Sequence, residues 1–202
     1  MNIAVYSGSF NPLHIGHLAI IRYMIEVAGF DMVYLIVSPK NPLKDSISSD
    51  SGTARYNAAI EAVNRHFADK AALEIWNDQT VASHTTKVHV DDIELTMPEP
   101  HYTIRTLDAL HDREPENAFT FVMGADNLAD IRRWRDYTRI LTEFGIAVYP
   151  RTGFDLETIR QDLLDENPAY KIQIISAPMV DISSTEIRQA QAHGEDVSHL
   201  LM

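Results

Sequence analysis

Four short apolar runs, each ended by a polar turn, constrain the fold of this chain most strongly. They cover residues 3–6, 32–37, 119–123 and 146–149, and Gly, Ser or Pro follows each of them. Runs of this length that are apolar at almost every position are typical of strands buried on both faces of a parallel sheet. Helical spacing then follows over residues 15–28, 53–68, 103–111, 127–132, 134–144, 156–164 and 184–192.

Strands that alternate with helices in this way predict an α/β fold. With a further strand over 171–176, the pattern indicates a doubly wound, mostly parallel, Rossmann-like sheet of five to six strands. Residues 73–76 and 87–95 are ambiguous, and each could add a strand. At 202 residues the whole chain fits a single domain, 1–202. In such sheets ligands bind beyond the carboxyl ends of the strands, so the polar segments that follow the strands are expected to converge there.

Composition excludes several classes of function. Lys and Arg number 17 against 29 Asp and Glu, and the net charge of −12 argues against a nucleic-acid or anionic-membrane partner. Without cysteine there is no disulfide, no Cys-ligated zinc and no thiol catalysis. No apolar run approaches 18 residues, and the chain opens on a strand pattern, so we expect a cytoplasmic protein.

The turn after the first strand carries the first functional signal. Gly8-Ser9 leads into a helix that begins with His14, Gly16 and His17. Free N–H groups at a helix start favour an anion, and imidazoles can donate to phosphate oxygens and stabilise charge at phosphorus. Gly16 leaves space between the imidazoles for a ligand to approach the backbone. Two alternatives stay open: a metal-binding histidine pair, or polar residues at a helix start with no further task.

The segment Ile182–Arg188 carries the second signal. Ser183 or Ser184 is expected to cap a helix, whose hydroxyls and free amides could hold a polyphosphate. Arg188 follows one turn later, within reach of phosphate oxygens. The alternative is a plain helix cap followed by a surface arginine.

These two segments resemble a known superfamily. Gly8-Ser9-Phe10-x-Pro12-x-His14-x-Gly16-His17 is similar to the G-x-F-x-P-x-H-x-G-H signature of the nucleotidyltransferases, and residues 182–188 resemble their I-S-S-T-x-I-R signature. Four further segments resemble the bacterial nicotinate-nucleotide adenylyltransferases: residues 38–44, 100–107, 124–128 with Trp134, and 149–153. Two positions depart from that family, since His101 stands where Ser is usual and Arg105 where Asp is usual.

The resemblance implies the nucleotidyltransferase fold and a reaction in NAD biosynthesis. The 5′-phosphate of nicotinate mononucleotide attacks the α-phosphorus of ATP in line, and nicotinate adenine dinucleotide and pyrophosphate form without a covalent enzyme intermediate. A nucleotide phosphate is already ionised near pH 7, so positioning and charge neutralisation suffice. Mg²⁺ is expected to enter with ATP and not to occupy a protein metal site. The expected partners are then ATP and nicotinate mononucleotide. Whether the chain forms a homo-oligomer is left open.

The same resemblance assigns roles to residues. Those expected to act on the reacting phosphates are His14, His17, Lys44 and Arg188. Those expected to bind ATP are Gly8, Ser9, Phe10, Gly16, Gly124, Asp126, Ser183, Ser184 and Thr185. Those expected to bind the acceptor nucleotide are Tyr102, Thr103, Trp134, Arg135 and Arg151.

Alternatives remain for some of these roles. Asp126 could cap a helix, Trp134 could be a packing residue, and Tyr102 and Thr103 could be core or cap residues. Arg135 and Arg151, with Arg105 as a third choice, are the cations that could offset a pyridine carboxylate. Alternative functions are a nicotinamide-mononucleotide or phosphopantetheine adenylyltransferase, or a non-catalytic nucleotide-sensing domain.

Overall fold

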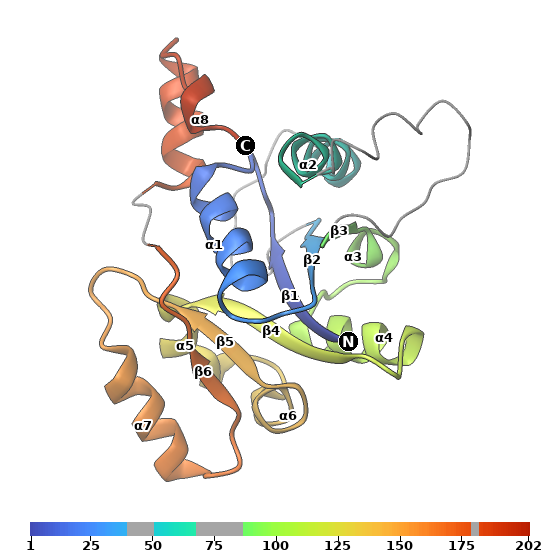
Figure 1. Ribbon diagram of the computed structural model, residues 1–202, viewed down its shortest axis with the longest axis vertical. Helices are drawn as coiled ribbons and strands as arrows, with labels where there is room; N and C mark the ends of the chain where they lie inside the picture. The colour runs from blue at the N-terminus through green and yellow to red at the C-terminus, as the bar shows by residue number, and fades with distance from the viewer. Residues whose placement is uncertain (40–50, 68–86, 179–181) are drawn as a thin grey trace.

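The computed structural model describes residues 1–39, 51–67, 87–178 and 182–202 (Figure 1). Within these residues, six parallel strands form one sheet in the order β3-β2-β1-β4-β5-β6. The strands are β1 (Asn2–Gly8), β2 (Met32–Val37), β3 (Val88–Asp91), β4 (Ala118–Gly124), β5 (Ile146–Tyr149) and β6 (Ile172–Ile174). The expected doubly wound α/β fold is confirmed, and the described sheet is parallel throughout.

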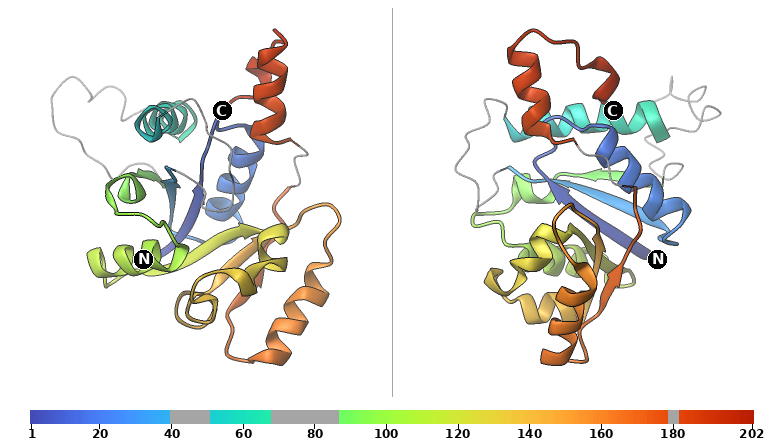
Figure 2. Two further views of the ribbon diagram at one scale, coloured as in Figure 1. Left: turned by 180° about the vertical axis from the view of Figure 1, so that it is seen from behind. Right: turned by 90° about the vertical axis from the view of Figure 1, so that its left-hand side faces the viewer.

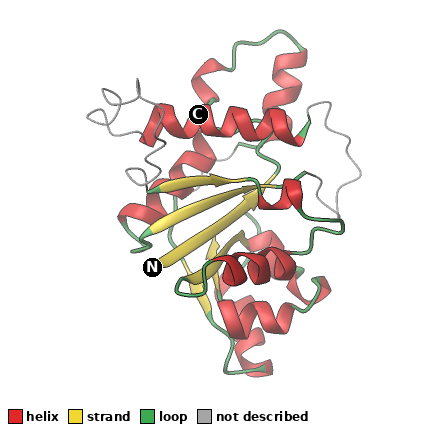
Figure 3. Ribbon diagram, turned by 90° about the vertical axis from the view of Figure 1, so that its right-hand side faces the viewer, coloured by secondary structure: helices red, strands yellow, loops and turns green. Residues whose placement is uncertain are grey.

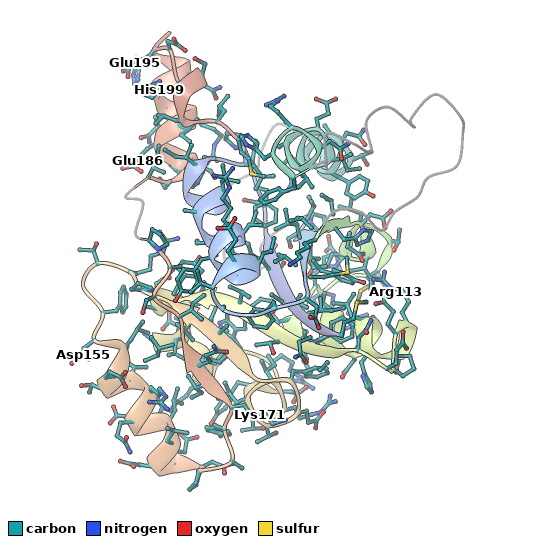
Figure 4. The ribbon with its side chains drawn as sticks, viewed as in Figure 1. Arg113, Asp155, Lys171, Glu186, Glu195 and His199 are labelled. Carbon is teal, nitrogen blue, oxygen red and sulfur yellow. The ribbon has the colours of Figure 1, made fainter. Side chains whose placement is uncertain are left out.

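Helices connect these strands and cover both faces of the sheet. They are α1 (Ile15–Glu26), α2 (Gly52–Phe67), α3 (Ile93–Thr96), α4 (Thr103–Arg113), α5 (Ala125–Ala129), α6 (Tyr137–Arg139), α7 (Leu156–Glu166) and α8 (Ser184–Ala192). Short 3₁₀ turns cover Ile131–Arg133 and Ser198–Leu200, and a π-helical turn covers Ile140–Phe144. Asp155, labelled in Figure 4, accepts a hydrogen bond from the Thr158 amide and so caps α7.

Alternation along β1 shows how the two faces are filled. Ala4 and Tyr6 point into one core with α1 and α2, whereas Ile3 and Val5 point into the other with α4 and α7. Figures 2 and 3 show α1 and α2 on one side of the sheet and α4 on the other. Because both faces are covered, the central strands read as continuous apolar runs, which is why the sequence indicated them clearly.

Two expected elements differ in the structure. Residues 87–95 form β3 only as far as Asp91, whose carboxylate accepts from the Ile93 amide and turns the chain into α3. A continuous helix over 134–144 is also wrong, because Trp134 has an extended backbone and Asp136 a φ of 51°. The possible strand at 73–76 lies outside the described residues.

The parallel arrangement brings the functional segments to one edge of the sheet. The segments 9–14, 38–39, 125–126, 150–151 and 182–188 each follow a strand at its carboxyl end, as expected. The end of the described chain also returns to this edge, where Leu201 pairs with His14 in an antiparallel bridge. Among the described residues, no helix is both long and apolar enough to cross a membrane. A cytoplasmic location stays a prediction.

Candidate active site

Two histidines form a reciprocal cap at the start of α1. His14 Nδ1 accepts from the Gly16 amide at 3.2 Å, and His17 Nδ1 accepts from the His14 amide at 3.2 Å. A nitrogen that accepts a hydrogen bond carries no proton, so in a neutral imidazole the proton lies on Nε2. Both side chains are therefore held as Nε2–H donors, and their rings lie against each other with centroids 3.8 Å apart and a tilt of 38°. The hydrogen bonds that cap the helix thus also leave both Nε2–H groups as donors.

Burial keeps both imidazoles neutral. Loss of hydration first, and then the Arg151 charge, lower the pKa of His14 from 6.5 to about 4. The pKa of His17 falls well below 6.5, first through burial and then through the neighbouring His14 and Arg151. Near pH 7 the pair presents neutral N–H donors. Such donors can stabilise charge that develops on phosphate oxygens without first losing a proton.

Gly16 packs directly against the His14 ring. A Cβ at this position would stand 3.0 Å from His14 Cε1 and Nδ1, so the imidazole would have to shift to admit a side chain. A glycine at this position therefore permits the histidine cap to form. The expected role of Gly16 in ATP binding stays a prediction.

The segment at the start of α8 holds the loop that precedes His14. Ser183 is the N-cap and forms a capping box with Glu186, which Figure 4 labels at the start of this helix. The Ser184 hydroxyl donates to the Pro12 carbonyl at 3.1 Å, and Arg188 Nη1 donates to the Asn11 carbonyl at 2.6 Å. Arg188 Nη2 donates to the Thr185 hydroxyl at 3.1 Å. The cap reading is thus correct for Ser183, but Arg188 is tied to the loop and is not a free surface residue.

A charged corner follows β4 and β5. Gly124 is the N-cap residue of α5, so Asp126 is not the helix cap that was the alternative. Arg151 Nε lies 3.8 Å from Asp126 Oδ1, and the guanidinium stands 5.3 Å from the centroid of the Tyr149 ring. A Cβ at Gly124 would touch Asp126 Oδ1 and would lie 3.2 Å from Arg151 Nε. The glycine lets the carboxylate and the arginine approach each other.

A cleft of about 200 Å³ runs from the Gly8-Ser9 turn to Trp134. Four of the residues assigned to the acceptor nucleotide line this cleft: Tyr102, Thr103, Trp134 and Arg135. Trp134 also packs edge-on against Phe121, with centroids 5.9 Å apart, so its packing role and its place in the cleft hold together. Arg133 adds a second cation to the lining. Arg151 is not among the lining residues and lies instead beside Asp126.

Three polar atoms behind this cleft are buried and have no partner among the described residues. They are Glu94 Oε2, His101 Nδ1 and Trp134 Nε1. The other Glu94 oxygen accepts from the Thr106 hydroxyl at 2.8 Å. Arg105, the third cation considered for the acceptor, donates to the Pro100 carbonyl at 2.7 Å and is not part of the cleft lining.

Comparison with known proteins agrees with this geometry. The family model described as cytidylyltransferase-like matches residues 5–190. This chain belongs to that family. A probable nicotinate-nucleotide adenylyltransferase of Flavobacterium johnsoniae is 35% identical over 201 residues, covering 100% of this chain and 92% of the relative. One from Flavobacterium psychrophilum, also named as probable, is 36% identical with the same coverage. The chain is thus a member of the nicotinate-nucleotide adenylyltransferases within the cytidylyltransferase-like family.

Solved structures support the fold. Nicotinic acid mononucleotide adenylyltransferase of Plasmodium falciparum, complexed with NaAD, superposes with a TM-score of 0.71 and 21% identity. The match covers 98% of this chain and 87% of that one. The same enzyme complexed with APC gives a TM-score of 0.68.

The family's expected residues fall into three groups in this structure. The Gly8–His17 turn, the start of α8 and the Gly124–Asp126 corner meet at the carboxyl edge of the sheet. The acceptor residues other than Arg151 gather in the neighbouring cleft. Lys44 lies outside the described residues, so its role stays a prediction. Among the described residues, no group of three or more His, Asp or Glu is gathered as a metal site.

Sequence reasoning missed several residues at this edge. Tyr6 and Tyr149 read as strand residues, yet both line the cleft, with ring centroids 6.2 Å apart. Glu94 falls in the segment that was ambiguous between strand and helix. Arg55 lies in the expected helix over 53–68 without having been singled out, and it is 4% exposed. Only the position of Tyr6 and Tyr149 near strand ends could have signalled them.

Proposed function

We propose that this chain transfers the adenylyl group of ATP to nicotinate mononucleotide and releases nicotinate adenine dinucleotide and pyrophosphate. The observation that carries the proposal is the pair of Nε2–H donors on His14 and His17, beside a cleft that ends at Trp134. The histidines do not themselves line this cleft, but the His17 ring lies 6.1 Å from that of Tyr6, which does. Family membership supports the same reaction.

The chemistry needs little beyond this arrangement. An oxygen of the acceptor phosphate forms a bond to the α-phosphorus of ATP, and the bond from that phosphorus to the β-phosphate oxygen breaks. A phosphate monoester is largely dianionic at pH 7, so its attack requires no general base. The histidine donors stabilise negative charge on the transferring phosphoryl group, and the start of α8 can take the leaving pyrophosphate. Mg²⁺ is proposed to arrive with the triphosphate, which is how this ion usually binds at such sites.

Two arginines favour nicotinate mononucleotide, which carries a carboxylate, over nicotinamide mononucleotide as the acceptor. Arg133 and Arg135 line the cleft, and within the described part of the chain their guanidinium groups pair with the exposed carboxylates of Asp130 at 3.7 Å and Asp136 at 3.2 Å. A nicotinate carboxylate would gain a charge-assisted hydrogen bond worth about 1.5–3 kcal/mol, or roughly 10–150-fold in specificity. The carboxamide of nicotinamide mononucleotide can accept from an arginine through its carbonyl oxygen, but it is uncharged and its bond would be weaker.

The test is a turnover assay with both acceptors side by side. Purified protein is incubated with ATP, Mg²⁺ and either mononucleotide, and the dinucleotide and pyrophosphate are quantified. We expect nicotinate mononucleotide to be preferred by at least about tenfold in kcat/KM. A preference for the amide would move the chain to the nicotinamide-mononucleotide reading. No turnover with either acceptor, in a protein that still binds ATP, would favour a nucleotide-sensing role.

A further inference from the structure

The loop between β1 and α1 is held by donors from three distant segments of the chain. Four backbone carbonyls of the loop accept these hydrogen bonds: Ser9 from Arg55 Nη1 at 2.6 Å, Asn11 from Arg188 Nη1 at 2.6 Å, Pro12 from the Ser184 hydroxyl at 3.1 Å and Leu13 from the Met202 amide at 3.3 Å. The loop ends at His14, the first member of the histidine cap. Its position therefore sets the position of the phosphate donors.

This loop has a reason to need such support. Phe10 has a φ of 45°, in the left-handed region that costs a side chain about 1 kcal/mol or more. Its ring is buried and stands edge-on to His17, with centroids 5.2 Å apart. A displacement of the loop would therefore move Phe10 and, through it, the imidazole it contacts.

Arg55 differs from the other donors because it also holds a second loop. The same Nη1 donates to the Ser38 carbonyl at 2.8 Å, and Nη2 donates to the Pro39 carbonyl at 2.9 Å. Ser9 follows β1, whereas Ser38 and Pro39 follow the adjacent parallel strand β2. Ser9 and Ser38 both line the cleft. One buried guanidinium thus joins the two loops that form one wall of the substrate site.

We propose that Arg55 is a positioning residue for adenylyl transfer. It fixes the separation of the loops after β1 and β2, and so it fixes where His14 and His17 meet the reacting phosphate. The inference rests on the proposed function. Arginine suits this task because its planar fork can serve several carbonyls at once, whereas the single ammonium of lysine cannot match that geometry.

A merely structural role predicts a different outcome. In that case, loss of the Arg55 fork would lower the free energy of unfolding, while the folded fraction would keep its turnover. A positioning role predicts that kcat falls in protein that is still folded, because a misplacement of about 1 Å can cost about 10²-fold in rate. The acceptor subsite should keep most of its affinity, because Trp134 is held by its packing against Phe121 and the Arg55 hydrogen bonds to Ser9, Ser38 and Pro39 do not involve it.

The neighbouring cavity makes chemical rescue practicable. Arg55 lines a second cavity of about 460 Å³, together with Ala54, Ala58 and Ala59 of the same helix. In Arg55→Ala this cavity gives a guanidinium ion access to the vacated position. Guanidinium chloride at about 20 mM is far below the molar concentrations that unfold proteins. Arg160→Ala is the matched control, because Arg160 also donates to a backbone carbonyl, that of Ile172 at 3.2 Å, but at the opposite end of the sheet.

The experiment measures kcat, both KM values, and the calorimetric affinity for a non-hydrolysable ATP analogue below the unfolding temperature. For Arg55→Ala we expect kcat about 10²-fold lower, a KM for nicotinate mononucleotide within about threefold of wild type, and ATP-analogue affinity at least about fivefold weaker. Guanidinium should restore kcat at least about tenfold, and should leave Arg160→Ala unchanged. Should the alanine variant not fold, Arg55→Lys replaces it, with kcat expected about tenfold lower.

The outcomes separate the two proposals. A folded Arg55 variant with kcat within about threefold of wild type overturns the positioning role. Loss of kcat that guanidinium does not restore, with full recovery of stability, also counts against it. If wild type forms no dinucleotide, the proposed function fails. In that event, an ATP-analogue affinity that is weaker in Arg55→Ala and is restored by guanidinium still supports the positioning role of Arg55. An unchanged affinity overturns that role.

Discussion

Replacing His17 by Asn and by Gln separates its two tasks. Asn carries Oδ1 at the same number of bonds from Cβ as the imidazole Nδ1, so His17→Asn can still accept from the His14 amide. Gln carries its amide nitrogen at the same number of bonds as Nε2, so His17→Gln can still donate toward the phosphates. The two variants therefore exchange which function is lost.

The magnitudes follow from the geometry. Losing one transition-state donor costs about 10²–10³-fold in turnover, so we expect His17→Asn to fall by that amount while its stability stays close to wild type. His17→Gln breaks half of the cap, which contributes about 0.5–2 kcal/mol. In a chain of this size that lowers Tm by about 2–4 °C per kcal/mol. Its turnover should exceed that of His17→Asn by at least about tenfold.

The assay pairs dinucleotide formation under saturating ATP with thermal unfolding followed by circular dichroism. His17→Ala is the reference that loses both functions. If turnover follows stability across the three variants, so that Asn is more active than Gln, then His17 acts by shaping the helix start. The assignment of its Nε2–H to the reacting phosphate would then be wrong.

Three further predictions test other parts of the site. His14→Asn should make stability less dependent on pH. In wild type the unfolded imidazole takes a proton near pH 6.5 and the folded one only near pH 4, so the free energy of unfolding decreases as the pH is lowered from 6.5 to 4, by at most about 1.36 kcal/mol per pH unit. Denaturant titrations of the variant should show a smaller decrease over the same pH range. Trp134→Ala should raise KM for both mononucleotides by about fivefold or more through lost stacking, with KM for ATP within twofold in steady-state assays; a specific loss of ATP affinity would contradict this. Gly124→Ala should raise KM for ATP by about fivefold and spare the acceptor, because its Cβ collides with the Asp126 carboxylate.

The strands were predictable because burial on both faces leaves a strong local signal. The first, second, third and fourth apolar runs became β1, β2, β4 and β5, and each motif followed a strand end. The start of α1 could also be predicted, since Gly8 indicates a turn and His14 lies at the helix start. Such features depend on residues that are neighbours in sequence.

Side-chain direction in the loops was not predictable in the same way. Arg151 was expected beside the pyridine ring, but it is not in the lining of the cleft at Trp134 and lies 3.8 Å from Asp126, since β4 and β5 are paired and end side by side at Gly124 and Tyr149. Arg55 gave no signal at all, since its acceptors are 16 to 46 residues away in sequence. Long-range hydrogen bonds such as these are decided by the packed structure, not by local pattern.

The start of α8 shows how one motif can serve both the fold and the chemistry. A guanidinium has five N–H groups, and Arg188 uses one to donate to the Asn11 carbonyl and one to donate to the Thr185 hydroxyl. Three N–H groups are left over, and we propose that they face the phosphates while the loop stays held. A lysine there would carry its three donors on one nitrogen and could not spread them over the carbonyl and a phosphate in the same way. In the proposed reaction the helix start and the arginine therefore act as a unit: the contacts that hold the loop before His14 also bring a permanent positive charge to the edge proposed for pyrophosphate.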